Sequence, residues 1–176
     1  MRIIRIFGFP ATCGGKVHRL HEPPMTYDRD TIKQYLICAA LNETEMVCDC
    51  VDSLGVYPDA TWGGKPTALC YAALHANAWL VGFLLERGAD ADHRDALDMT
   101  PLHYGALGGC TESSRLLVAA GACVFRRNRF GKSPSDLLPA TLTGERRREM
   151  LTLYHGTTSD VRTLYTARIV GAADRA

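Results

Sequence analysis

Apolar residues in the middle of the chain recur at helical spacing in short runs, and each run is bounded by a polar turn or a glycine. Leu102 and Ala106 lie four residues apart, so they share one face of a helix. The pair Thr100-Pro101 precedes them. A threonine is a good N-cap, and a proline is tolerated at the first helical position. The pattern predicts a helix that begins at Thr100-Pro101 and is broken at Gly109.

The same pattern returns with a period of about 33 residues, which predicts a repeat protein. Residues 116–118 predict a second helix, closed by Gly121 in a left-handed conformation that glycine adopts at little cost. Five classes of position hold the spacing: Thr67, Thr100 and Ser133; Leu36, Leu69 and Leu102; Ala40, Ala73 and Ala106; Val51, Leu84 and Leu117; Gly55, Gly88 and Gly121. One such unit cannot bury its apolar face alone, whereas stacked neighbours can, so we expect Leu69 and Leu102 to be fully buried.

Two stretches resemble the ankyrin repeat family. Residues 98–106, DMTPLHYGA, match its G-x-T-P-L-H-x-A-A, with Asp98 for the usual glycine and Gly105 for an alanine. Residues 84–92, LLERGADAD, match its L-L-x-x-G-A-D-V-N. The resemblance is strong over 64–138 and weaker over 31–60. It implies an all-α repeat solenoid of about four units, in which His103 has a structural role in the turn that joins repeats.

The predicted array covers residues 31–156 and includes capping units. Thr31 to Asp59 forms the N-terminal cap, because its outer positions are polar: Lys33, Gln34, Asn42, Glu43 and Glu45. The second unit runs from Trp62 to Asp95 and the third from Ala96 to Asn128. The fourth begins at Phe130, and Pro139 stops its first helix early. A charged helix from Glu145 to His155 forms the C-terminal cap.

The two ends of the chain differ from the array. Residues 1–9 are rich in β-forming side chains, so residues 1–30 predict an N-terminal extension with a possible β-hairpin, and residues 157–176 predict a C-terminal tail. Arginines interrupt the short apolar run at the start, so we do not expect a signal peptide.

Composition excludes several classes of function. The chain has 176 residues, 47% of them apolar, and a net charge of +1 from 20 basic and 19 acidic side chains, which does not suggest nucleic-acid binding. No apolar run approaches the length of a membrane span. Seven cysteines without an export signal indicate free thiols in a reducing compartment, so we expect a cytoplasmic protein.

Candidate catalytic and metal sites are weak. Cys38, Cys48 and Cys50 lack the spacing of a zinc site, and Cys13, His18 and His21 supply only three neighbouring ligands, so we expect no metal and no cofactor. His155-Gly156-Thr157 resembles the segment that opens some NAD-using ADP-ribosyltransferase domains. Only residues 158–176 follow it, too few for the sheet of such a domain, and we expect no enzyme.

The resemblance implies that the loop tips and the exposed side of the first helices form a concave binding surface. Several apolar and aromatic residues occupy positions that are predicted to be exposed to solvent. Tryptophan and arginine are also residue types that are enriched at binding hot spots. The predicted partner-binding residues are Trp62, Leu74, His75, Arg94, Leu97, Met99, Leu107, Arg127, Arg129, Phe130 and Lys132.

We therefore expect a protein-protein interaction module whose partner is another protein and which has no small-molecule substrate. Its small size favours a stand-alone inhibitor or an immunity-type protein, an idea that rests on family analogy. Two alternatives remain: an NAD-using enzyme at His155-Gly156-Thr157, and a nucleic-acid-associated module that uses the basic run Arg126 to Lys132.

Overall fold

The protein is described by a computed structural model over residues 28–155, and all regular secondary structure in this part of the chain is helical, as the sequence predicts. Residues 1–27 of the predicted N-terminal extension, with its possible β-hairpin, and the predicted tail of residues 157–176 lie outside the described residues. Arg29 and Asp30, at the end of that predicted extension, belong to the first helix. The helices are α1 (Arg29–Ala40), α2 (Thr44–Asp52), α3 (Ala68–Leu74), α4 (Ala78–Glu86), α5 (Pro101–Gly108), α6 (Thr111–Ala119), the 3-10 helix η1 (Pro134–Leu137) and α7 (Gly144–His155).

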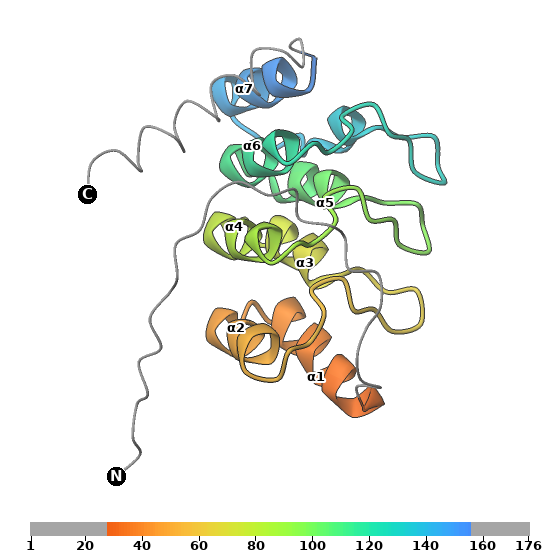
Figure 1. The fold of residues 1–176 in the computed structure, drawn as a ribbon. Helices are drawn as coiled ribbons and strands as arrows, with labels where there is room; N and C mark the ends of the chain where they lie inside the picture. Colours follow the sequence, from red (N-terminus) through yellow and green to blue (C-terminus); the bar gives the residue numbers. More distant parts are fainter. Residues whose placement is uncertain (1–27, 156–176) are drawn as a thin grey trace, which may run out of the picture.

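Successive helix pairs stack into a two-layered array, and the loops between units project to one side (Figure 1). The inner layer contains α1, α3, α5 and η1, each packed on the next, and α4, α6 and α7 pack in turn in the outer layer. The core lies between the layers. Leu69 and Leu102 are fully buried there, as predicted, and their equivalent Leu36 is 5% exposed.

The predicted helix starts are confirmed. Thr67 caps α3 by accepting a hydrogen bond from the N–H of Cys70. Pro101 is the first residue of α5, and Thr100 stands before it in extended conformation. Ser133 and Asp136 form a reciprocal capping box at η1. The side chain of Thr67 satisfies a backbone donor that the first helical turn leaves unpaired. At the other two starts the side chain of the third helical residue accepts from the backbone N–H of Thr100 or Ser133.

The predicted helix ends are confirmed as well. Gly88 and Gly121 have φ values of +91° and +100°, and Gly109 ends α5 in the left-handed region with φ of +64°. A side chain with a Cβ is strained in this region, which is why glycine recurs at these positions. Pro139 follows the short η1, whose last residue is Leu137, so the first helix of the fourth unit does stop early.

Both ends of the array show a polar outer face, as capping units require. The five polar residues predicted to face water on the first unit are exposed. In α7 the residues from Arg146 to Glu149 are exposed, whereas Met150, Leu153 and Tyr154 are buried against the array. The hydroxyl of Tyr154 lies 3.0 Å from that of Ser114 on α6, which ties the cap to the third unit.

Two glycines should respond in opposite directions to alanine. A Cβ on Gly108 would collide with the carbonyl oxygen of Leu74, an atom of the neighbouring unit's backbone, whereas a Cβ on Gly82 in α4 would meet nothing within 4 Å. We expect Gly108→Ala to lower the free energy of unfolding by about 1–3 kcal/mol. Gly82→Ala should raise it by about 0.5–1 kcal/mol, because alanine loses less entropy in a helix. Urea unfolding measures both, and an unchanged or more stable Gly108→Ala variant would contradict the unit-to-unit contact.

Candidate partner-binding edge

Three turns at the tips of the inter-unit loops form what we call the loop edge: residues 62–65, 95–98 and 128–131. Each turn is closed by a backbone hydrogen bond from its fourth to its first residue, at 3.2, 3.0 and 2.9 Å respectively. In Figure 1 the loops that carry these turns lie one above another on the same side of the array. The edge is thus a row of translated copies, as the repeat predicts.

A side-chain oxygen organises the second and third turns. Asp95 Oδ1 accepts from the backbone N–H groups of Leu97 and Met99 at 2.8 and 2.9 Å. Asn128 Oδ1 accepts from Phe130 and Lys132 in the same way, both at 3.0 Å. An amide or carboxylate oxygen that binds its own following backbone N–H groups fixes a turn locally. The side chains between these bonded amides are therefore presented in one backbone conformation.

Neighbouring loops are also bonded to each other. The N–H of Ala96 donates to the carbonyl of Gly64 at 3.1 Å, and the N–H of Arg129 donates to the carbonyl of Leu97 at 3.0 Å. The three turns of the loop edge therefore form one hydrogen-bonded ladder. These backbone groups are paired within the protein, so a partner meets a surface that is already built.

His103 anchors this ladder to the helices, which confirms its predicted structural role. It is fully buried at the start of α5. Its Nδ1 accepts from the N–H of Thr100 at 3.1 Å, which leaves Nε2 to donate to the carbonyl oxygen of Lys132 at 3.1 Å. Burial lowers the pKa of His103, since the charged form loses its hydration.

Most of the predicted partner-binding side chains reach the surface. Leu97 and Leu107 are 40% and 39% exposed and Phe130 is 68% exposed. His75, Arg94, Arg127, Arg129 and Lys132 are exposed as well, and Leu74 is half-buried. His75 lies at the end of α3, where its Nε2 contacts the carbonyl oxygen of Ala40 at 2.8 Å.

The expectation that Met99 is exposed is wrong, because its side chain is 8% exposed. The loop doubles back at this point, and the carbonyl of Met99 accepts from the N–H of Asp95 at 3.1 Å. Lys132 occupies the same position one repeat later and stays in water. An apolar thioether turns inward at a site where an ammonium group remains hydrated.

Trp62 is half-buried and packs against the core, so it is less exposed than the sequence predicts. It stands where the later turns have Asp95 and Asn128, and its indole offers no oxygen to the following amides. Gly63 and Gly64 take φ values of +61° and +71° instead, which gives a different turn with the same closing bond. The Trp62 indole, which takes no part in closing the turn, lies beneath two cations: Arg29 is 5.6 Å and Lys33 is 5.1 Å from the centre of its ring.

Two arginines of the basic run Arg126 to Lys132 have partners within the protein. Arg126 pairs with Asp92 at 3.0 Å, and Arg127 donates to the carbonyl of Gly131 at 2.7 Å. Arg94 on the previous loop pairs with Asp98 at 3.0 Å. The loops therefore carry charges of both signs, and several of their arginines have a partner within the protein.

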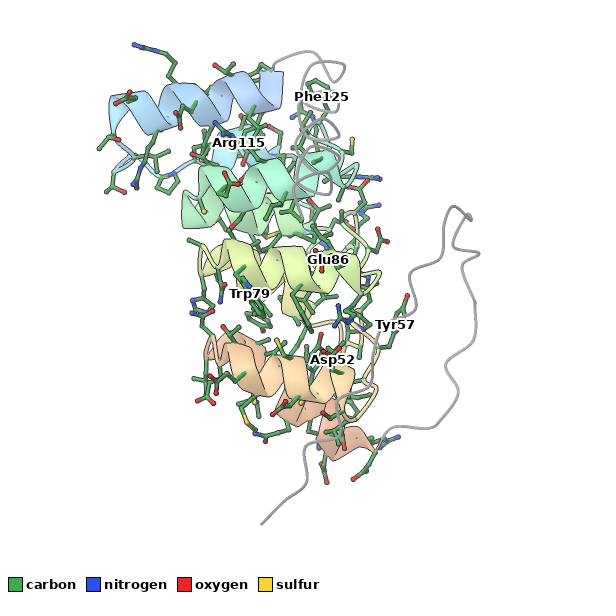
Figure 2. The ribbon with its side chains drawn as sticks, turned by 60° about the vertical axis from the view of Figure 1, so that its left-hand side comes forward. Asp52, Tyr57, Trp79, Glu86, Arg115 and Phe125 are labelled. Atoms are coloured by element: carbon green, nitrogen blue, oxygen red, sulfur yellow. The ribbon has the colours of Figure 1, made fainter. Side chains whose placement is uncertain are left out.

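An exposed aromatic pair on the outer layer was missed by the sequence analysis. Trp79 of α4 is 64% exposed and stacks on Phe83, with ring centres 5.6 Å apart, and Arg87 lies 4.5 Å from the Phe83 ring. Figure 2 shows Trp79 between α4 and α2. The available signal is that α4, AWLVGFLLE, is apolar around its whole circumference, so that one face must reach the surface.

The structure describes only part of the other candidate sites. Within residues 28–155 no three potential metal ligands gather, and Cys38, Cys48 and Cys50 are free thiols. Cys13, His18 and His21 lie outside the described residues, as do Gly156 and Thr157 of the segment that resembles an NAD site. None of the helices that the structure describes is long and apolar enough to cross a membrane.

Comparison with known proteins agrees with the geometry. The family model of "Ankyrin repeats (3 copies)" matches residues 28–128. Protein phosphatase 1 regulatory subunit 27 of Homo sapiens is 36% identical over 93 residues, which are 53% of this chain and 57% of that protein. Cyclin-dependent kinase inhibitor 2A of Monodelphis domestica is 29% identical over 130 residues, 72% of this chain and 73% of that protein.

A third relative is much longer. Protein fem-1 homolog A of Homo sapiens is 35% identical over 89 residues, 51% of this chain and 13% of that protein. The chain thus spans little more than half the length of the phosphatase regulatory subunits that it matches, and a small part of the longer relative.

His103 should make the stability of the array depend on pH. Its pKa in the folded protein lies below the ordinary value of 6.5. The unfolded chain therefore binds more protons below that pH, and stability falls as the pH drops from about 6.5. Urea unfolding at about pH 7.5 and about pH 5.5 should show a loss for the wild type that is smaller in His103→Gln. Equal losses in the two proteins would contradict this role for His103.

Proposed function

Because this chain belongs to the ankyrin repeat family, we propose that it binds and regulates another protein through the loop edge and the inner helices, and that it is not an enzyme. The observation that carries the proposal is the preformed ladder of turns, which holds the exposed side chains of Leu97 and Phe130 without help from a partner. A surface that is ordered before binding loses less entropy when it binds.

The composition of the edge supports this function. Leu97 and Phe130 provide apolar contact area at the second and third turns, and arginines stand beside both. Interfaces commonly place aromatic and arginine side chains at their energetic centre, with a polar rim that excludes water. The proposed contact area continues from the turns onto Leu74, His75 and Leu107 at the ends of the inner helices.

A regulatory role is consistent with the relatives, which include a phosphatase regulatory subunit and a kinase inhibitor. We infer that this chain likewise regulates its partner, either by covering it, as an inhibitor does, or by recruiting it to another protein. The six described cysteines are free thiols, which supports a cytoplasmic location, since reduced thiols persist in that compartment.

Replacing two loop-tip side chains should remove binding and leave folding intact. We expect the Leu97→Ser, Phe130→Ser double variant to lose about 2 kcal/mol or more of binding free energy, roughly 30-fold in Kd, if these side chains are hot spots. Its free energy of unfolding should change by less than about 0.5 kcal/mol per site, as is usual for exposed positions. Affinity capture from the native source identifies partners, and calorimetry with the purified partner measures the Kd.

Phe125→Ser is the matched control. Phe125 is 66% exposed, much like Phe130, but it lies outside the three turns of the loop edge. It should retain the wild-type partners and their affinity. Undiminished affinity in the double variant, or an equal loss in Phe125→Ser, would place the interface elsewhere. The exposed face of Trp79 and Phe83 would then be the next surface to test.

A further inference from the structure

A cleft of about 230 Å³ opens at the N-terminal end of the inner layer, between α1, α3 and the first turn of the loop edge. Its apolar lining includes Ile37, Ala40, Trp62 and Tyr71, and two ammonium groups stand at its walls, on Lys33 and Lys65. Ile37 is 50% exposed, although α1 buries its other face in the core. The cleft is thus an open apolar surface with cations beside it.

The first unit differs from the units that follow it, because α1 begins earlier than the other helices of the inner layer. α3 begins at Ala68 and α5 begins at Pro101, which is 33 residues later. The corresponding position in the first unit, 33 residues before Ala68, is Tyr35. α1 instead begins at Arg29, more than one helical turn before that position. The additional length places Arg29 and Lys33 beside Trp62, so the end of the array carries a cationic wall.

The positive charge at the cleft is only lightly compensated. Lys33 lies 2.9 Å from Asp30, one turn away on the same helix, but the side chains are 44% and 80% exposed. Exposed pairs of this kind contribute little to stability, because water and salt screen the two charges. Arg29 and Lys33 both face the Trp62 ring, which leaves their charge near the cleft.

We propose that this cleft binds an acidic segment of the partner protein, with one apolar side chain of the segment placed against Ile37, Trp62 and Tyr71. Carboxylates on either side of that apolar anchor meet Lys33 and Lys65. The inference rests on the proposed function and names the chemistry of the partner. An apolar lining between two cations favours such a segment over a nucleic acid, whose regular phosphates would leave the apolar surface unmatched.

The N-terminal part of the chain that precedes the array is a poor match for the same cleft. Residues 1–27 contain four lysines and arginines and one glutamate, so their charge has the same sign as the walls. Charge complementarity therefore favours a segment from another protein.

A synthetic peptide with a central phenylalanine and three acidic residues on each side is the probe. The chain has two tryptophans, so in a Trp79→Phe background the fluorescence of Trp62 reports directly from the cleft wall. We expect a saturable change with the acidic peptide. A version with glutamine and asparagine in place of the acids, and a version with glycine in place of phenylalanine, should each bind at least about tenfold more weakly.

The cations are tested by a Lys33→Gln, Lys65→Gln double variant, with Arg115→Gln as control, since Arg115 is exposed on α6 of the outer layer (Figure 2). The double variant should weaken the acidic peptide by at least about tenfold and leave the neutral peptide unchanged, whereas Arg115→Gln should change neither. Circular dichroism establishes that the variants are folded.

Three results would overturn the proposal: no saturable signal with the acidic peptide, equal binding of the neutral peptide, or equal binding by the lysine double variant. Failure here is separable from failure of the proposed function. If the peptide does not bind but the Leu97→Ser, Phe130→Ser variant still loses its partner, the cleft alone is refuted. If the peptide binds but that variant keeps its partner, the role of those loop tips is refuted.

Discussion

The burial of each unit's apolar face by its neighbour is the interaction on which the rest of this structure depends. Leu69 and Leu102 are fully buried at equivalent positions in consecutive inner helices, and their surroundings come from more than one unit. At about 25 cal/mol per Å² of apolar surface, a buried leucine contributes about 1.5–3 kcal/mol relative to an exposed one. Because the units stack at a fixed repeat step, each loop has the same position relative to the helices of its own unit.

The loop edge follows from that stacking together with a second, polar set of contacts. Asp92 accepts from the N–H of Cys123, and Asp59 accepts from that of Asp90, so carboxylates join adjacent loops at the same step. His103 joins the helix start to the last turn. These contacts explain how long connections without regular secondary structure present a defined surface.

Much of the fold is predictable from the sequence, because glycine, threonine and proline positions have local physical causes that repeat. The side-chain directions are less predictable. Met99 and Lys132 share one repeat position, yet one is buried and the other exposed, and only the packing of the individual loop separates them. The place of Trp62 depends on Arg29 and Lys33, which lie in the preceding unit, in a part of α1 that the repeat pattern does not cover. Trp79 was missed because the family resemblance directs attention to the loops.

The central claim is that the loop edge is formed before any partner arrives, and amide hydrogen exchange of the free protein tests it most directly. The N–H groups of Leu97 and Met99 donate to Asp95, and those of Phe130 and Lys132 donate to Asn128. We predict that these four amides exchange at least about tenfold more slowly than in an unstructured peptide of the same sequence. Exchange at the unstructured rate would mean that the turns form only on binding, and it would contradict this account.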